Sequence, residues 1–366
     1  MKRIIIVLGA TGGHIFPGIS IADALRKTNK EVDILFVNTS NLNIGLSELK
    51  LNHKLVQIDS LGFKGKSIML KAKSLFTLIK SIIQSNQLLN EFKADAIIGT
   101  GGFVSLPVCL SGYLRGVKIF AIEGNSVPGL ANRVIANFCK NIFISFEESI
   151  KYFPRKKCIK TGYPTRDFGI TTSKKKTYDL LILGGSQGSK ILNSKMLFAV
   201  ENILEKVSGN LTKGNDTFSI VHQTGIEDRK SVENSYATLK KRHPFLEFET
   251  FEFITNLEDF YSSTRVLVSR AGASTISESL RFPFFSILIP IKDSTNNHQH
   301  LNAVELSNKN LAEIHLESQE NSVLCNKIIN FLYNDEIGSV YLKSKEKILK
   351  DKNPAEQICD KILETL

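Results

Sequence analysis

Three glycine-rich turns constrain the fold of this chain more than any other feature. They occupy residues 9–14, 99–102 and 184–188, and each lies where a short strand-like run meets a helical pattern. Glycine lets backbone N–H groups approach a phosphate closely, and the N-terminus of the following helix adds positive potential. The first and third turns lie about half a chain apart and open two similar halves. We therefore expect a phosphate-rich ligand held between two α/β domains.

Strand-like runs alternate with longer helical patterns along the whole chain. The expected strands are residues 4–8, 33–37, 96–98, 118–122, 141–145, 179–183, 218–222, 246–251, 266–269 and 285–290. Short β-branched runs separated by helices indicate parallel sheets with crossover connections. Such sheets are doubly wound and bind ligands at the carboxyl ends of their strands.

The length of the chain and a polar linker near its middle predict two domains. A chain of 366 residues exceeds the usual size of one hydrophobic core. We place the boundary after the segment 162–166, before a polar, lysine-rich linker at 170–177, giving domains 1–165 and 166–366. Asn353-Pro354-Ala355-Glu356 has the pattern of a helix start. A last helix, residues 354–366, could therefore pack back on the first domain.

The positive charge is confined to the first half of the chain. Residues 1–170 hold 23 Lys/Arg and 11 Asp/Glu, a net charge of +12, whereas residues 171–366 hold 24 and 25, a net charge of −1. Only the first domain is thus expected to meet an anionic surface. Nucleic acid is disfavoured, because no basic-aromatic interleaving or nucleic-acid motif is present and Trp is absent. An anionic membrane face is favoured.

Compartment and redox state follow from the apolar runs and the cysteines. The longest apolar runs are shorter than the roughly 18 residues of a spanning helix, and residues 4–8 are too short for a signal sequence. We expect a mature cytoplasmic start. Five scattered cysteines without a C-x-x-C pair indicate reduced thiols, with no zinc site and no disulfide framework.

Residues 70–83 have two interpretations. Lys73 and Lys80 lie opposite a helical face made of Leu75, Phe76, Leu78, Ile79, Ile82 and Ile83. In the first interpretation a domain helix buries this face. In the second, an apolar tip at residues 63–70, ringed by lysines, rests on anionic lipid headgroups. Both can hold together.

Polar residues at the expected strand ends are the candidates for chemistry in the first half. His14 follows the first glycine turn at a helix N-terminus, where a neutral imidazole could accept a proton from a hydroxyl. The second turn, with Gly101, Gly102 and Phe103, is either part of the same phosphate site or a plain tight turn. Asn125 could donate a hydrogen bond to a sugar hydroxyl or could simply form a turn.

The second half offers a comparable set. Ser186 places a hydroxyl beside exposed N–H groups, which suits a diphosphate. Glu278 lies about one turn inside a helix, where it could take both ribose hydroxyls or merely favour the helix start. Gln299 could contact a sugar. His298 and His300 resemble a metal pair but have no apparent third ligand, so we expect no metal.

Two other classes of nucleotide-binding protein are disfavoured by the spacing and order of residues in the glycine-rich turns. Neither residues 9–14 nor residues 184–189 fit the G-x-G-x-x-G dinucleotide fingerprint, and the second strand ends in Val37-Asn38-Thr39 without a ribose-binding acid. Gly188-Ser189-Lys190 has its Ser and Lys in the wrong order for a P-loop. Hydride transfer and ATP hydrolysis are therefore not expected.

Taken together, the motifs resemble the MurG family, the bacterial UDP-N-acetylglucosamine:undecaprenyl-diphosphoryl-MurNAc-pentapeptide N-acetylglucosaminyltransferases. They are residues 12–18, 99–102, 184–189, 222–225, 274–278 and 297–299. The resemblance implies the GT-B fold, two Rossmann-like, doubly wound parallel-sheet domains facing across a cleft. It implies a peripheral enzyme on the cytoplasmic face of the inner membrane. This enzyme makes lipid II from UDP-N-acetylglucosamine and lipid I in peptidoglycan synthesis, and so serves cell-wall growth and cell division without a metal or other cofactor.

The resemblance also assigns roles to residues of this sequence. It implies that His14 is the base that deprotonates the muramyl C4 hydroxyl for an inverting displacement. Thr11, Gly12 and Gly13 would contact the donor sugar and the acceptor diphosphate, and Asn125 would hold the N-acetylglucosamine. The remaining substrate contacts would be Arg166 and Ser186 at phosphate or nucleotide, the Ile254 backbone at uracil, the segment Ala273, Ser274, Thr275, Ile276 and Ser277, Glu278 at the ribose, and Gln299 at the sugar hydroxyls.

Four positions depart from the pattern usual in the family. Ile122 and Gly124 stand where members commonly have His and Gln, Ala10 replaces a frequent Gly, and Tyr163 replaces a frequent Asn. These departures affect fine contacts more than activity. Two alternatives stay open: another GT-B transferase acting on a membrane glycolipid, and a non-catalytic regulator that binds a UDP-sugar.

Overall fold

The computed structural model describes residues 1–28, 31–39, 53–60, 68–165, 177–208 and 217–366. The chain divides into two compact units. Unit 1 is Met1–Asp167 together with Lys352–Leu366, and unit 2 is Phe168–Asp351. Each unit is an α/β domain built around its own parallel sheet, which confirms the predicted fold class.

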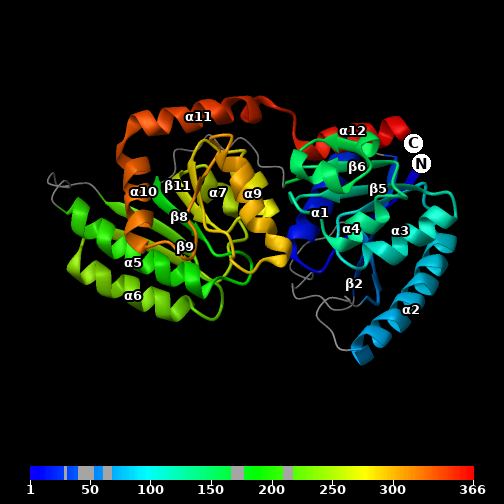
Figure 1. The fold of residues 1–366 in the computed structure, drawn as a ribbon, viewed down its shortest axis with the longest axis horizontal. Coiled ribbons are helices and arrows are strands. Elements are labelled where there is room, and N and C mark those ends of the chain that lie inside the picture. Colours follow the sequence, from blue (N-terminus) through cyan, green and yellow to red (C-terminus); the bar gives the residue numbers. More distant parts are fainter. Residues whose placement is uncertain (29–30, 40–52, 61–67, 166–176, 209–216) are drawn as a thin grey trace. The chain divides into compact units, whose positions relative to one another are not determined.

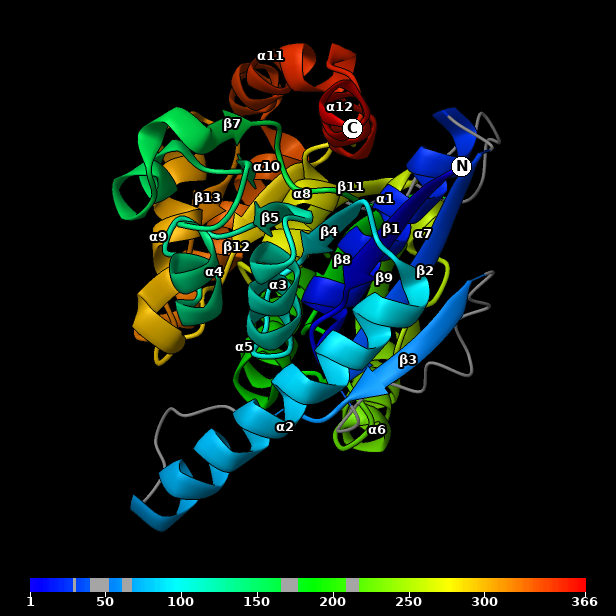
Figure 2. The same ribbon diagram turned by 90° about the vertical axis from the view of Figure 1, so that its right-hand side faces the viewer.

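The described strands of unit 1 form a seven-stranded sheet in the order β3-β2-β1-β4-β5-β6-β7 (Figure 2). Every neighbouring pair is parallel. Ile4, Ile5, Ile6 and Val7 of the central β1 are completely buried, as expected for a parallel strand covered on both faces. The strands are β1 (Lys2–Val7), β2 (Val32–Thr39), β3 (Lys54–Ile58), β4 (Ala96–Gly99), β5 (Lys118–Glu123), β6 (Asn141–Ile144) and β7 (Cys158–Lys160).

The last helix of the chain packs within unit 1, where the two termini lie close together (Figure 1). The Sγ of Cys359 lies 3.5 Å from the carbonyl oxygen of Ile21 in the first helix, and Lys2 Nζ donates to Leu366 O at 2.7 Å. Asn353 caps this helix by accepting from Ala355 N, as the sequence predicted. The helices of unit 1 are α1 (Gly12–Thr28), α2 (Ile68–Phe92), α3 (Ser105–Leu114), α4 (Leu130–Ile135), α12 (Pro354–Thr365) and the 3₁₀ turns η1 (Glu147–Tyr152) and η2 (Arg155–Lys157).

Helix α2 buries only part of the apolar face that the first interpretation of residues 70–83 assigned to the core, since Leu78 and Ile82 are half-buried. Phe76, Ile79 and Ile83 are 71%, 52% and 54% exposed. The helix is buried instead along a serine stripe, Ser74, Ser81 and Ser85, followed by Leu88 and Leu89. Ser81 Oγ donates to the carbonyl oxygen of Asp59, so this stripe faces the segment that follows β3, and the larger side chains are left on the outside. The proposed tip, residues 63–70, lies largely outside the described residues.

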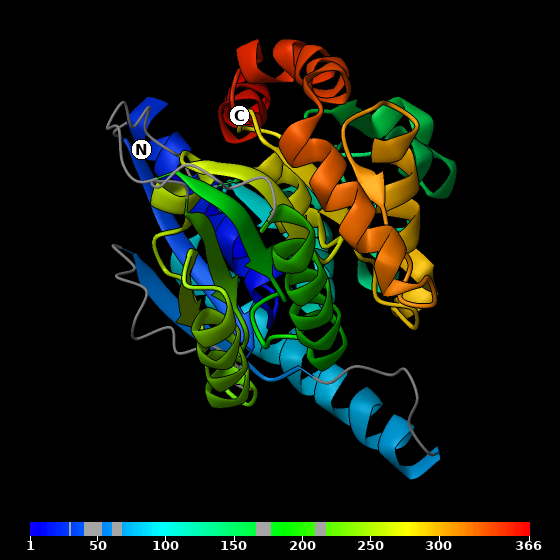
Figure 3. The same ribbon diagram turned by 90° about the vertical axis from the view of Figure 1, so that its left-hand side faces the viewer.

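The described strands of unit 2 form a six-stranded parallel sheet in the order β10-β9-β8-β11-β12-β13. Figure 3 shows this unit in green, yellow and orange. The strands are β8 (Tyr178–Leu183), β9 (Phe218–Gln223), β10 (Leu246–Phe251), β11 (Thr264–Ser269), β12 (Phe285–Leu288) and β13 (Glu313–Ile314). The helices are α5 (Lys190–Val207), α6 (Arg229–Arg242), α7 (Leu257–Tyr261), α8 (Ala273–Ser279), α9 (His298–Ser307), α10 (Asn321–Tyr333), α11 (Asp335–Lys350) and the 3₁₀ turn η3 (Thr295–Asn297).

Both units share one strand order, in which the chain reverses direction across the sheet after its third strand. The reversal lies between β1 and β4 in unit 1 and between β8 and β11 in unit 2. In open α/β sheets the crevice at such a switch point, beyond the carboxyl ends of the strands, is the usual ligand site. The three predicted glycine turns follow β1, β4 and β8, so each lies at one of these two switch points.

Candidate functional site

His14 is the third residue of α1, at the switch point of unit 1. Its Nδ1 lies 2.8 Å from the carbonyl oxygen of Thr100, the residue that follows β4. A carbonyl only accepts hydrogen bonds, so Nδ1 carries the proton and Nε2 carries the lone pair of the neutral ring. The Thr100 hydroxyl has one proton to donate and lies 2.8 Å from the carbonyl oxygen of His14 and 3.0 Å from that of Val7, which fixes the two turns to each other. In this tautomer Nε2, and not Nδ1, is the ring nitrogen that can accept a proton.

Two glycines form the walls of the space that the His14 ring occupies. A Cβ atom at Gly101 would lie 2.7 Å from His14 Cε1, and one at Gly9 would lie 2.7 Å from His14 Cδ2. Gly101 also has a φ of +109°, which side-chain-bearing residues rarely adopt. The second glycine turn therefore serves to hold the imidazole, a role that sequence reasoning missed for Thr100 and Gly101.

The first turns of α1 present backbone to solvent beside this ring. Thr11 and Gly13 are exposed, while Gly12 is buried. The Gly13 carbonyl accepts a hydrogen bond from the Tyr163 hydroxyl at 2.6 Å. Burial raises the pKa of Tyr163 well above its usual range, so the phenol stays protonated and keeps donating. Tyr163, one of the departures from the family pattern, thus supports the glycine turn.

Asn125 is oriented by the buried carboxylate of Glu123 at the end of β5. Glu123 Oε1 accepts from Asn125 N at 2.9 Å and from Asn125 Nδ2 at 3.1 Å. Glu123 Oε2 accepts from Gly129 N and from Asn132 Nδ2. Burial raises the pKa of Glu123, and the donors from Asn132, Asn125 and Gly129 oppose this shift. Glu123 is therefore a structural clamp that fixes where the Asn125 amide lies.

In unit 2, Ser186 is exposed in the turn that follows β8. A Cβ at Gly188 would lie 2.2 Å from the carbonyl oxygen of Thr224, so this turn rests on the backbone that follows β9. The Gln223 amide ties the turn to Ile254, because its Nε2 donates to Gly185 O at 2.8 Å and its Oε1 accepts from Ile254 N at 2.9 Å. The Ile254 N–H is thereby engaged inside the protein.

Arg270 occupies the switch point of unit 2, directly after β11, and sequence reasoning did not assign it a role. It is 6% exposed, and its guanidinium donates to Ser189 Oγ, the N-cap of α5, and to Ile289 O at 3.0 Å. Its Nη1 pairs with Glu317 Oε1 at 2.7 Å. Burial lowers the pKa of Arg270, which Glu317 opposes. The sequence signal that could have identified Arg270 is its position directly after a buried strand.

The segment predicted to meet the ribose forms α8. Glu278 is buried, with 5% exposure, and its Oε2 accepts from the Tyr261 hydroxyl at 3.1 Å. Ser274 has a buried hydroxyl with no hydrogen-bond partner in the described part of the chain. Ala273, Thr275 and Ser277 are half-buried, whereas the side chain of Ile276 is in the core, so Ile276 can offer a ligand only its backbone.

The remaining predicted residues are dispersed. Gln299 lies in the first turn of α9, and its Oε1 accepts from Ile291 N at 3.1 Å. The Nδ1 of His298 lies 2.7 Å from Thr295 O. Arg166 lies outside the described residues. Among the residues that are described, no group of three or more His, Cys, Asp or Glu side chains is placed to hold a metal ion.

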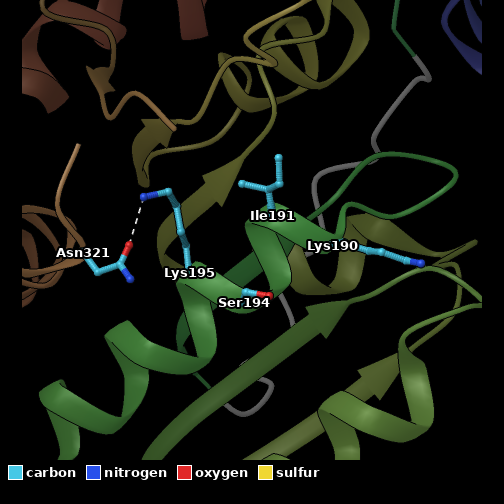
Figure 4. Close-up of a pocket in the computed structure, with 5 residues that line it drawn as sticks. All are labelled: Lys190, Ile191, Ser194, Lys195 and Asn321. Carbon is cyan, nitrogen blue, oxygen red and sulfur yellow. Dashed lines mark hydrogen bonds between the residues drawn. The ribbon is translucent and has the colours of Figure 1, made fainter. Parts of the chain in front are cut away.

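A shallow pocket lies beside the first turns of α5 (Figure 4). It is lined by Lys190, Ile191, Ser194, Lys195 and Asn321. Lys195 reaches across it and donates to Asn321 Oδ1 at 2.9 Å and to Gln319 O at 2.8 Å, which fixes the start of α10 against α5. None of these side chains was a predicted site residue.

Comparison with known proteins settles the family. Residues 4–144 match the glycosyltransferase family 28 N-terminal domain, and residues 179–358 match its C-terminal domain. The UDP-N-acetylglucosamine--N-acetylmuramyl-(pentapeptide) pyrophosphoryl-undecaprenol N-acetylglucosamine transferase of Thermodesulfovibrio yellowstonii is 36% identical over 342 residues, 91% of this chain and 90% of that protein. The chain belongs to the MurG family of glycosyltransferases. The predicted family and enzyme class are thereby confirmed.

A second relative belongs to the same family, and solved structures share the fold. The transferase of the same name from Geotalea daltonii is 33% identical over 343 residues, 92% of this chain and 90% of that protein. The crystal structure of Acinetobacter baumannii MurG superposes with a TM-score of 0.75 at 22% identity, covering all of both chains. A UDP-GlcNAc 2-epimerase from Neisseria meningitidis shares the fold, with a TM-score of 0.66 at 13% identity, covering 100% of this chain and 99% of that one.

In the parts of the chain that the structure describes, no helix combines the length and hydropathy needed to cross a membrane.

Proposed function

We propose that this chain transfers N-acetylglucosamine from UDP-N-acetylglucosamine to the C4 hydroxyl of undecaprenyl-diphosphoryl-MurNAc-pentapeptide, lipid I, and so forms lipid II. The names of its relatives supply the substrates. One structural observation carries the chemistry: the Thr100 carbonyl holds the proton on His14 Nδ1. With Nδ1 protonated, Nε2 is the nitrogen that would accept the proton of a sugar hydroxyl in the proposed reaction.

The proposed reaction is a single inverting displacement. His14 Nε2 takes the proton of the C4 hydroxyl as that oxygen forms a bond to the anomeric carbon of the donor. The bond from the anomeric carbon to the diphosphate breaks, and UDP leaves with the electron pair. In this proposal Thr11, Gly12 and Gly13 place the acceptor diphosphate at the N-terminus of α1, and Asn125, held by Glu123, contacts the N-acetylglucosamine.

Unit 2 is proposed to hold the donor nucleotide. Ser186 and the N-terminus of α5 would stabilise the diphosphate as charge develops on it, with Arg166 adding a cation. Ile254 would read uracil through its carbonyl, because its N–H is engaged by Gln223. Glu278 would accept from the ribose hydroxyls, the segment 273–277 would line the nucleotide, and Gln299 would contact the sugar.

The test of this activity is a transfer assay with radiolabelled UDP-N-acetylglucosamine and two acceptors, lipid I and diacylglycerol. Transfer to lipid I alone is expected. Transfer only to diacylglycerol would favour a glycolipid synthase, and binding of the donor without transfer would favour a regulator. His14→Ala should abolish transfer and leave UDP affinity within about twofold, since the base does not contact the nucleotide in this proposal. Full activity in that variant would remove His14 from the base role.

We also propose peripheral binding of unit 1 to an anionic membrane, at the cytoplasmic face of the inner membrane. Helices α2, α3 and α4 expose large apolar side chains, in a unit that holds the positive charge excess of the sequence. These side chains are Phe76, Ile79, Ile83, Tyr113, Leu114, Leu130 and Val134. Apolar residues beside lysines, such as Lys80 on α2, are typical of interfacial helices.

Vesicle sedimentation with the full chain tests the membrane proposal. Phe76→Glu should weaken binding to anionic vesicles about tenfold or more, because it removes apolar area and adds repulsion. Phe198→Glu is the matched control, since Phe198 is 45% exposed on α5 of unit 2. Binding should also weaken in high salt. Equal losses in both variants would contradict the proposal.

A further inference from the structure

Lys345 of α11 is buried, and each of the three N–H groups of its ammonium has an acceptor. Its side chain is 1% exposed, and Nζ donates to the carbonyl oxygens of Ser279 at 3.2 Å, Phe282 at 3.2 Å and Phe284 at 2.6 Å. Nζ also lies 4.7 Å from the centroid of the Phe284 ring, within cation–π range. Burial lowers the pKa of Lys345 to about 7, whereas three carbonyl acceptors match the three N–H groups of the ammonium form.

Arg281 makes the reciprocal contact. Its Nη1 donates to Ile348 O at 3.2 Å and to Asp351 O at 3.1 Å, at the end of α11. Ser279, which Lys345 contacts, is the last residue of α8. Carbonyls at a helix C-terminus lack partners inside the helix and carry partial negative charge, so a cation there satisfies both needs. Lys345 of α11 therefore binds a carbonyl at the C-terminal end of α8, and Arg281, which follows α8, binds carbonyls at the C-terminal end of α11.

The segment fixed by Lys345 supports the carboxylate of Glu278. The rings of Phe282 and Phe284 stack with centroids 6.0 Å apart. The ring of Tyr261 lies 5.1 Å from that of Phe282 and 5.5 Å from that of Phe284. The Tyr261 hydroxyl then donates to Glu278 Oε2 at 3.1 Å. A contiguous path of hydrogen bonds and ring contacts thus runs from the ammonium to the carboxylate.

The same cluster reaches the second residue proposed to hold the nucleoside. Ile254 and Leu257 are buried together with Tyr261, Phe282 and Phe284 in one hydrophobic cluster. A displacement of the segment 279–284 would therefore be felt at both the ribose and the uracil ends of the proposed nucleoside site. Cores transmit such displacements because they are close-packed.

We propose that Lys345 is a positioning residue for ribose recognition: it anchors the segment 279–284, on which Tyr261 rests, and so holds the Glu278 carboxylate toward the ribose hydroxyls. This inference rests on the proposed function of unit 2 as the donor site. It goes beyond that function by assigning a role to a side chain of α11 that does not itself contact the nucleotide.

The experiment compares the affinities of the full chain for UDP and for 2′-deoxy-UDP, by calorimetry and without acceptor. Wild type should prefer UDP by about tenfold or more, the range of a hydrogen bond to a charged group. Glu278→Ala should abolish this preference, and its ratio of affinities for the two nucleotides sets the value expected when the carboxylate is absent. Lys345→Met keeps the apolar stem and removes the ammonium. It should reduce the preference to a third of the wild-type value or less and change affinity for 2′-deoxy-UDP at most twofold.

Lys343→Met is the matched control, because it makes the same change at an exposed position of the same helix. It should keep the wild-type preference. Lys345→Gln and Tyr261→Phe are measured alongside, each first checked for a native melting transition. Tyr261→Phe removes one oxygen atom only, so the final step of the path can be tested without a large change in packing.

The ratio separates positioning from general loss of stability, since a partly unfolded protein loses affinity for both nucleotides equally. An unchanged preference in any folded variant among Lys345→Met, Lys345→Gln and Tyr261→Phe would overturn the proposal, as would an equal loss in Lys343→Met. Failure of the proposed function looks different: the wild type would show no preference for UDP, or Glu278→Ala would keep the wild-type preference.

Discussion

The ring of His14 lies against Gly101, where a Cβ atom would stand 2.7 Å from its Cε1. The residue before that glycine, Thr100, accepts the Nδ1 proton of the same ring. Two turns distant in sequence thus fix both the position and the tautomer of one imidazole. Orientation of a catalytic group at this level is worth large factors in rate, so the second turn belongs to the catalytic machinery that we propose.

Gly101→Ala should therefore lower kcat about 100-fold by displacing the imidazole. Gly116→Ala is the matched control, because Gly116 also has a positive φ, +75°, but nothing lies within 4 Å of its Cβ position. Both variants carry a backbone strain of about 1–2 kcal/mol, which lowers stability. Only Gly101→Ala should also lower kcat. Steady-state transfer assays and urea unfolding distinguish the two effects. Comparable kcat values for the two variants would contradict this account of Gly101.

Glu123→Gln should both destabilise unit 1 and impair transfer. The amide replaces an oxygen that accepts N–H groups from Asn125, Gly129 or Asn132, so a donor would face a donor. We expect a loss of about 2–4 kcal/mol in the free energy of unfolding. Glu148→Gln, at a 61% exposed side chain on η1, should change neither quantity. Wild-type stability in Glu123→Gln would show that the clamp is unimportant.

The acid stability of unit 2 should depend on His222. Burial lowers its pKa to about 3, and its ring contacts Asn193 and Tyr236 rather than any acid. Because the unfolded chain takes up a proton near pH 6.5 and the folded one does not, this stability is fully present above pH 6.5 and is lost as the pH falls toward 3.

Urea unfolding measured between pH 7 and pH 4 checks this sign. The wild type should lose up to about 1.4 kcal/mol per pH unit from this residue, and His222→Gln should lose correspondingly less. Above pH 7 the difference between the two proteins should be constant. A difference that grew toward alkaline pH would refute the assignment.

Ile358→Ala in α12 should destabilise unit 1 by about 2–4 kcal/mol. Ile358 is completely buried in a helix that packs against α1. Lys361→Ala, an exposed position of the same helix, should change stability by less than about 0.5 kcal/mol. Chemical unfolding monitored in unit 1 gives both numbers, and equal values would mean that α12 adds little.

The ten strands predicted from sequence are all present, and the three strands that were missed, β3, β7 and β13, lie at sheet edges. Central parallel strands are buried on both faces and therefore appear as continuous β-branched runs. In the edge strand Lys54–Ile58 only Ile58 is buried, and Glu313–Ile314 is only two residues long. Hydrophobic runs do not reveal such segments.

The candidate site was predictable only in part. His14 and Glu278 could be found because each stands in a recognisable pattern at a strand end or helix start. Thr100 acts through its backbone carbonyl, which no side-chain pattern reveals. Arg270 contacts Ser189, which lies 81 positions away, and the carbonyl partners of Lys345 lie at least 61 positions away. Such contacts depend on the tertiary fold. The buried serine stripe of α2 misled the sequence interpretation because small polar residues can be buried while larger apolar ones stay exposed.

Unit 1 is assembled from two stretches of chain that are separated by the whole of unit 2. During synthesis on the ribosome, α1 therefore emerges long before α12, its packing partner, has been made. The contact between Cys359 and the backbone of Ile21 in α1 can form only after α12 has left the exit tunnel. Completion of unit 1 therefore waits for the synthesis of unit 2, and a chain truncated before Pro354 would have all of unit 2 beside an incomplete unit 1.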